Sequence, residues 1–363
     1  MLPLSGWLIL LSTVLPGAWS ITEIRVGMIV AENVDPTAIG YSTSGGAIAV
    51  ALDRIRNESL LNGYNFTFFV EIVDCDAAKT VGALIQFIQQ NKVHAVVGPP
   101  CGGLYAGTMS TAYNLPMFMW GYTFISDLTS DDRFPYVSTI TATSLSLGYG
   151  FLKLAEYFKW DRIAILYTRD SVAYCDNIVS DTETAINDEN TYQTTLAYKA
   201  VLDESANSTY YARMQSARER ARIIVLCLPS GPTKRRFFAR AFQLGMATNE
   251  YVYVMLDIKG IGFGQAGNAA ERLQSGYVPF WVDVERNNTD GLDALAKKGA
   301  ARAISIDTTR RSDDLAKAFN DDILDRIIGP PLYCNTTACL LAAAGGQSVY
   351  VRSIVLGTFQ DER

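Results

Sequence analysis

The chain has 363 residues, more than one ordinary globular domain, and this length predicts two domains of moderate size or one large α/β unit. Hydrophobic residues make up 49% and charged residues 19% of the chain, which excludes a disordered protein and a coiled coil. The formal net charge of −6 disfavours a broad surface for nucleic acid, and we expect no nucleic acid partner.

Residues 1–20 have the pattern of a secretory signal peptide. The apolar stretch 7–11 precedes Pro16-Gly17 and the small residues around Ser20, after which we predict cleavage. This stretch is too short to span a bilayer comfortably, and no run of about 18 apolar residues follows it. We therefore predict an extracellular or secreted chain. Five N-glycosylation sequons agree with export, at Asn57, Asn65, Asn207, Asn287 and Asn335.

Short β-branched runs then alternate with amphipathic helical stretches, the pattern of βα units around parallel sheets. Within 77–91, apolar residues recur at three- and four-residue spacing, so one helix face is expected to pack on a sheet. The single histidine, His94, opens a strand and is expected to be structural, which disfavours triad catalysis and histidine-rich metal sites. We predict strands at 24–30, 66–73, 95–98, 162–167, 223–228 and 251–256, and helices at 45–57, 77–91, 103–114, 144–158, 210–220, 234–244 and 315–328.

These elements form two blocks that divide near residue 150. The predicted class is α/β, with two Rossmann-like lobes of parallel sheet flanked by helices. Because open parallel sheets bind ligands at the carboxyl ends of their strands, we expect a binding site between the lobes. The predicted division is a first ligand-binding lobe at 21–150, a second at 151–280, and a segment at 281–363 that returns to the first lobe and has a divergent C-terminal end.

Several stretches, taken in their order and spacing, resemble a known family. They are 73–76, 96–101, 114–118, 132–136, 158–167 and 330–335. The set resembles the type I periplasmic-binding-protein fold in its extracellular receptor version, and most closely the ligand-binding region of receptor guanylyl cyclases, including the natriuretic-peptide receptors. The resemblance covers residues 24 to about 340.

The resemblance implies an extracellular ligand-binding region of a receptor that controls cyclic GMP production when full-length. It also implies a homodimer, with the helices at 45–57 and 77–91 as the usual contact, and a membrane association only for a full-length receptor. The family's transmembrane, kinase-like and cyclase domains have no counterpart here, so we expect a truncated, non-enzymatic chain with an incomplete second lobe. A secreted binding or decoy protein is the first alternative, and a secreted α/β hydrolase or glycosidase is a distant one.

The ligand stays open between a peptide, a small molecule and an ion, and we expect no metal or cofactor. The natriuretic-peptide branch binds chloride at backbone N–H groups beside the position of Cys101, but Pro100 has no N–H to donate, so we predict no chloride site. Where amino-acid-sensing relatives carry a Ser-Thr pair, this chain has Thr123-Phe124, and the aromatic ring would obstruct a small zwitterion.

Exposed aromatic residues after a strand end are expected to grip a cleft ligand, with core packing as the alternative. The predicted cleft residues are Trp120, Tyr122, Thr123 and Tyr174.

Six cysteines in an oxidising compartment predict three disulfides. Cys75 and Cys101 follow neighbouring strands, and a bond between them should stabilise the first lobe by about 3 kcal/mol. We further expect Cys175 with Cys227 in the second lobe, and Cys334 with Cys339 as a local loop. The resemblance implies the first and third of these pairs.

Two other patterns are interpreted as structural features without a binding role. The formal G-x-G-x-x-G at 262–267 is separated from the strand at 251–256, so we interpret it as a flexible glycine loop rather than a dinucleotide site, although a helix at 268–273 is possible. The basic clusters at 213–222 and 234–236 are interpreted as solvated helix faces.

Overall fold

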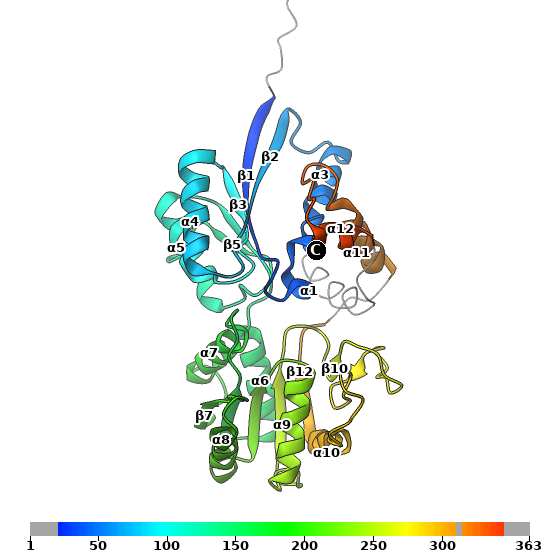
Figure 1. Cartoon of the computed structure of the whole chain (residues 1–363). Helices are drawn as coiled ribbons and strands as arrows, with labels where there is room; N and C mark the ends of the chain where they lie inside the picture. The colour runs from blue at the N-terminus through cyan, green and yellow to red at the C-terminus, as the bar shows by residue number, and fades with distance from the viewer. Residues whose placement is uncertain (1–20, 310–313, 345–363) are drawn as a thin grey trace, which may run out of the picture.

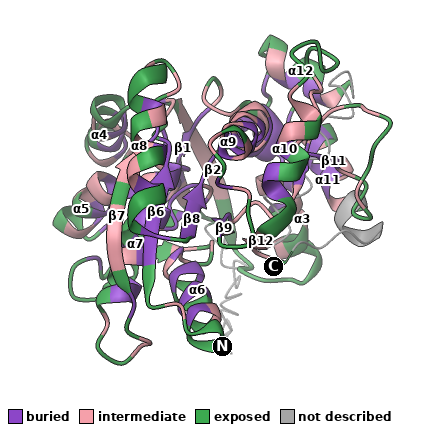
Figure 2. Cartoon of the chain, turned by 90° about the horizontal axis from the view of Figure 1, so that it is seen from below, coloured by how far each residue is buried: buried purple, intermediate pink, exposed green. Residues whose placement is uncertain are grey.

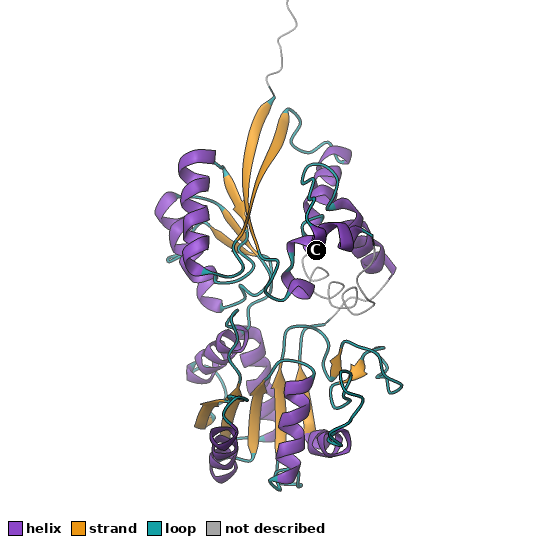
Figure 3. Cartoon of the chain, in the orientation of Figure 1, coloured by secondary structure: helices purple, strands orange, loops and turns teal. Residues whose placement is uncertain are grey.

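The computed structural model describes residues 21–309 and 314–344 and shows two lobes, each built on a five-stranded parallel sheet (Figure 1). The strand order is β2-β1-β3-β4-β5 in the first sheet and β12-β9-β8-β6-β7 in the second. Helices cover both faces of each sheet (Figure 3). The predicted α/β class with two lobes is confirmed.

The first lobe is organised around β1, which lies between β2 and β3. Side chains alternate across a strand, so Ile29 packs with the α4 side whereas Met28 and Val30 pack on the opposite face. The elements are β1 (Thr22–Val30), α1 (Pro36–Ile39), α2 (Tyr41–Ser44), α3 (Ala47–Asn57), β2 (Tyr64–Ile72), α4 (Ala77–Gln86), the π-helical turn η1 (Phe87–Asn91), β3 (Ala95–Val97), α5 (Gly103–Tyr113), β4 (Met117–Met119), η2 (Ser126–Thr129) and β5 (Val137–Thr139).

The second lobe repeats this plan, and its central strands β6, β8 and β9 are almost fully buried (Figure 2). Such continuous apolar runs are typical of a sheet covered on both faces. The elements are α6 (Leu145–Phe158), β6 (Arg162–Tyr167), α7 (Tyr174–Asn187), β7 (Thr195–Val201), α8 (Asn207–Arg220), β8 (Ile223–Cys227), α9 (Pro232–Gln243), β9 (Val252–Leu256), the antiparallel pair β10 (Gly264–Gln265) and β11 (Val278–Pro279), α10 (Asp293–Gly299), η3 (Ala300–Arg302) and β12 (Ala303–Ile306).

The chain returns to the first lobe after β12, where α11 (Asp314–Arg326) and α12 (Thr337–Ala343) pack against α2 and α3. Gly46 lies so close to α11 that a Cβ atom there would stand 1.9 Å from the Ile323 carbonyl oxygen. The predicted boundary at residue 150 lies within α6, whose main helical neighbour is α7 of the second lobe. Beyond residue 281, β12 pairs with β9 in the second sheet.

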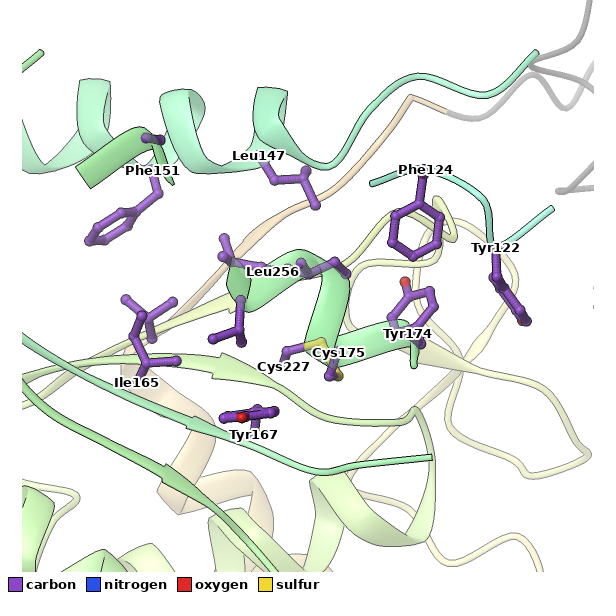
Figure 4. Packing of buried hydrophobic residues seen from close by; sticks show 14 of the residues in the cluster. Tyr122, Phe124, Leu147, Phe151, Ile165, Tyr167, Tyr174, Cys175, Cys227 and Leu256 are labelled. Atoms are coloured by element: carbon purple, nitrogen blue, oxygen red, sulfur yellow. A yellow bond between two sulfur atoms is a disulfide. The ribbon is translucent and has the colours of Figure 1, made fainter. Parts of the chain in front are cut away.

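One apolar cluster joins the two lobes. It contains Trp120, Tyr122 and Phe124 from the first lobe and Tyr174 from the second. Figure 4 shows Tyr122 and Phe124 beside Tyr174. Beside it, the buried Asp181 of α7 accepts hydrogen bonds from the Ser126 backbone N–H (3.0 Å) and the Ser126 hydroxyl (2.6 Å). The Ser144 hydroxyl also donates to Asp181. Packing and polar contacts therefore both hold the lobes together.

Several elements were not predicted, and one possible helix is absent. The structure adds α1, α2, α7, α10, α12, β4, β5, β7, β10, β11, β12 and the short turns η2 and η3 to the predicted elements. Residues 268–273 form no helix. The predicted signal peptide and the divergent segment 345–363 lie outside the described residues, and no helix among the described residues is long and apolar enough to cross a membrane.

Three disulfides form in the structure: Cys75–Cys101, Cys175–Cys227 and Cys334–Cys339. They join the pairs that the sequence predicts. The first connects the ends of β2 and β3, which lie on either side of β1 rather than next to each other as predicted. The second connects α7 to β8, and the third links the segment before α12 to the first turn of that helix.

Replacing both Cys75 and Cys101 by serine should lower the free energy of unfolding by about 3 kcal/mol, because the bond closes a long loop in the unfolded chain. Urea unfolding and the secreted yield measure the effect. The matched control replaces Cys334 and Cys339, whose shorter loop predicts a smaller loss of about 2 kcal/mol. An unchanged midpoint and yield for the first variant would contradict a structural role of this bond.

Candidate functional site

A cavity of about 50 Å³ lies between the lobes, at the carboxyl ends of strands from both sheets. The first lobe contributes residues that follow β1 and β4, and the second contributes residues that follow β6, β8 and β9. This is where open parallel sheets place their ligands. The lining residues are Asp35, Tyr122, Asp170, Val172, Tyr174, Leu228, Pro229, Ser230, Asp257 and Lys259.

An ion pair crosses this cavity from one lobe to the other. Lys259 Nζ lies 3.4 Å from Asp35 Oδ2, and the Tyr122 hydroxyl donates to the same oxygen at 2.6 Å. Burial alone would raise the pKa of Asp35, but Lys259 and the Tyr122 hydroxyl outweigh it and hold this pKa below its usual value. Asp35 is therefore a carboxylate at neutral pH.

The Lys259 ammonium also faces two aromatic rings. Its Nζ lies 5.2 Å from the ring centroid of Tyr122 and 5.2 Å from that of Tyr174. The two rings meet edge to face at 5.3 Å, and Phe124 packs against Tyr174 at 5.4 Å (Figure 4). Burial opposes the charged form of Lys259, yet Tyr122 and Asp35 hold the pKa of this lysine above its usual value. Lys259 is therefore charged at neutral pH.

A second ion pair lies beneath the cavity. Lys234, in the first turn of α9, is 2.8 Å from Asp257 Oδ2, and both side chains are almost fully buried. The Tyr174 hydroxyl donates to the other oxygen of Asp257. Burial would raise the pKa of Asp257, but Lys234 lowers it below its usual value. The pair thus fixes the position of the Tyr174 ring that lines the cavity.

Asp170 and Asp307 are held by backbone amides. Asp170 accepts from the N–H groups of Val172 (3.2 Å) and Tyr174 (2.9 Å), and burial raises the pKa of Asp170. Asp307 accepts from Gly260, Ile261 and Gly262 at 2.8, 2.9 and 2.8 Å. The amides at the start of the glycine-rich loop are therefore bound by the chain's own carboxylate, which is a physical reason against a phosphate at this loop.

The four predicted cleft residues separate into two groups. Tyr122 and Tyr174 line the cavity, whereas Trp120 and Thr123 do not. The prediction that Trp120 and Tyr122 are exposed was wrong, because both pack in the apolar cluster between the lobes, with Trp120 7% exposed. The Thr123 hydroxyl donates to the Trp120 carbonyl oxygen at 2.8 Å. The ligand contacts of Tyr122 and Tyr174 stay a prediction.

Sequence reasoning missed the charged residues of the site, Asp35, Asp170, Asp257 and Lys259. Their shared signal is a charged residue within a few positions of the end of a buried strand. The interpretation of residues 234–236 as a solvated helix face was also wrong, because Lys234 and Arg235 are buried. Arg235 pairs with Asp290 and Asp293, each at 2.5 Å. No group of acidic, histidine or cysteine side chains within 21–309 and 314–344 is arranged to hold a metal ion.

The remaining predicted residues lie at the surface. His94 Nδ1 accepts a hydrogen bond from the Arg25 backbone N–H at 2.9 Å, a contact between β1 and the approach to β3. All five sequon asparagines, Asn57, Asn65, Asn207, Asn287 and Asn335, are exposed. Their glycosylation stays a prediction.

A two-lobed α/β fold with a cavity at facing strand ends has the geometry of a ligand-binding region. The chain belongs to the family described as the receptor family ligand binding region, whose model matches residues 43–341. It is an extracellular ligand-binding receptor region, and its family implies a place outside the cell or at the cell surface.

The chain is similar to receptor-type guanylate cyclases of nematodes. It is 34% identical, over 91% of its length, to receptor-type guanylate cyclase gcy-4 of Caenorhabditis briggsae and also to that of Caenorhabditis elegans. Identity to receptor-type guanylate cyclase gcy-5 of Caenorhabditis elegans is 30%, again over 91% of the chain. The chain spans about 30% of the length of these relatives.

Proposed function

We propose that the chain is the sensing region of a receptor-type guanylate cyclase, and that its ligand binds in the cavity between the lobes. The observation that carries this proposal is the Asp35–Lys259 ion pair, whose partners come from opposite lobes and line the cavity. A ligand that engages either partner changes the free energy that holds the lobes together. The resulting lobe movement then controls cyclic GMP production by a cyclase domain of the full-length receptor.

The same proposal includes the route and assembly of the chain. A signal peptide at residues 1–20 directs export, and glycans attach to the exposed sequon asparagines. Two copies pair through α3 and α4, the outer helices of the first lobe. A secreted ligand-binding or decoy protein is the second candidate, because the two-lobed fold and its cavity would suit ligand binding in that setting as well.

The test is a chimeric receptor in which residues 21–344 replace the matching region of the Caenorhabditis elegans gcy-4 cyclase. Asp35→Asn and Lys259→Met each remove the same interlobe contact, so both should change the basal cyclic GMP level in the same direction, by about fivefold or more. The double variant should add little to either single variant, because the two changes act on one interaction.

Lys153→Met serves as the control, because its side chain is 82% exposed on α6 and should leave cyclic GMP unchanged. Surface labelling of each chimera verifies equal amounts at the membrane. If the interlobe variants reach the surface normally and leave cyclic GMP at the level of the control, coupling between the lobes and the cyclase is contradicted.

A further inference from the structure

The Lys259 side chain reaches from the second lobe into a cage formed by Asp35, Tyr122 and Tyr174. Its backbone N–H is fixed by Asp257 Oδ1 at 3.2 Å, and its ammonium faces the Asp35 carboxylate and the rings of Tyr122 and Tyr174. A carboxylate combined with aromatic faces is the usual protein environment for organic ammonium groups. The cage therefore has the chemistry of an amine site, and the chain's own lysine occupies it.

The charges around the cavity favour a cation. Asp35, Asp170 and Asp257 contribute carboxylates to its lining, and Lys259 is the cation among the lining residues. The charge of Asp257 is balanced by Lys234 below the cavity. Across the part of the chain that the structure describes, no lysine or arginine lies within ion-pair distance of Asp170, whose carboxylate accepts from amides instead. The site thus remains acidic even with Lys259 in place.

We propose that the Asp35–Tyr122–Tyr174 cage binds ligands that carry an organic ammonium group, and that Lys259 is a tethered internal ligand which such an amine displaces. This inference rests on the proposed function for the place of the ligand between the lobes. Because a tethered group acts at a high effective concentration, a free amine must gain further contacts in the cavity to compete. Ser230 and Asp170 line the same cavity and supply polar groups for those contacts.

The test removes the Lys259 side chain and adds a small molecule that contains the atoms removed. Lys259→Ala deletes the side chain from Cγ to Nζ, and n-propylammonium has the same three carbons and ammonium group. In the purified full chain, n-propylammonium at about 10 mM should raise the Tm of Lys259→Ala by about 3 °C. It should leave the unmodified chain unchanged, because Lys259 fills the cage.

Matched additives and variants isolate the ammonium. n-Propanol and propionate should leave the Tm of Lys259→Ala unchanged, because neither carries an ammonium group. n-Propylammonium should leave the Tm of Lys259→Met unchanged, because the methionine side chain fills the space. It should also leave the Tm of the Asp35→Asn, Lys259→Ala double variant unchanged, because the carboxylate is gone. Equal shifts with n-propanol and n-propylammonium, or an undiminished shift in the double variant, would overturn the proposal.

A second measurement uses the unmodified chain and covers the case in which Lys259→Ala does not fold. Acetylation needs the neutral amine, so caged Lys259 should react about tenfold more slowly than Lys153 on the surface of α6. Equal rates, followed by mass spectrometry, would overturn the cage.

The two proposals fail separately. If n-propylammonium stabilises Lys259→Ala but the interlobe variants do not change cyclic GMP in the chimera, the amine site is supported and coupling to the cyclase is contradicted. If the chimera responds and the Tm does not shift, the sensing region stands and the ligand is not an amine.

Discussion

Lys234→Met should lower the free energy of unfolding by about 3 to 5 kcal/mol, because it leaves the buried Asp257 carboxylate without its cation. Both side chains are nearly inaccessible, at 2% and 3% exposure, so water compensates little for the lost partner. Methionine keeps the length and the apolar stem of lysine, which limits the change to the charge. Urea unfolding followed by circular dichroism at pH 7 measures the loss.

The matched control is the double variant with Lys234→Met and Asp257→Asn, which removes both charges. It should recover most of the stability, because a neutral amide has a far smaller cost of burial than an unpaired carboxylate. Lys153→Met, which breaks the exposed contact with Glu156, should cost no more than about 0.5 kcal/mol. Equal losses in the single and double variants would contradict the ion-pair explanation.

Trp120→Ala should cost about 3 to 5 kcal/mol, because it leaves a large gap in the apolar cluster shared by the two lobes. Because Trp120 is buried, the main expected effect is a loss of stability. An exposed residue in the cleft would instead lose ligand response while the fold stayed intact. Denaturant unfolding of the purified chain measures the cost.

Tyr157→Ala is the control for aromatic truncation. Tyr157 is 79% exposed at the end of α6, so its removal should change stability by about 0.5 kcal/mol or less. A stable Trp120→Ala protein that had lost ligand response would instead place this ring in direct contact with the ligand.

Much of the sheet could be predicted from the sequence because the central strands are continuous apolar runs. β6, β8 and β9 are buried on both faces, and their composition alone identifies them. The edge strand β7 carries exposed polar residues, and β4 and β5 have three residues each, too few for a periodic pattern.

Helix α7 shows why some helices escaped prediction. Its buried face includes Asp181 and Thr182 as well as Ile178. Those polar groups are tolerated because Ser126 and Ser144 donate to Asp181 from outside the helix and Thr182 donates to the Ile178 carbonyl oxygen. Asp181 and Thr182 interrupt the apolar stripe of Ile178, Val179, Ala185 and Ile186, which makes the helical pattern harder to recognise.

The site was harder to predict than the fold, for a similar reason. Asp35 and Lys259 are 224 residues apart in the chain and meet only when the lobes assemble. Neither residue belongs to a motif, and a charged residue after a strand is ordinarily solvated. Tyr122 could be predicted because it is an aromatic residue just after the end of β4. The same rule also selected Trp120, which packs in the apolar cluster and does not line the cavity.

The return of α11 and α12 to the first lobe has a consequence for biosynthesis. A ribosome completes the strands of the first sheet at Thr139. Tyr41 of α2 and Ile48 of α3 cover part of the face that carries Met28 and Val30, but α11 and α12, which complete this cover, begin only at Asp314. Part of that face must therefore stay open while the whole second lobe is translated, with apolar surface available to chaperones and to misassembly. Because Gly46 admits α11 with no room for a side chain, final closure depends on a late and sterically exacting docking event.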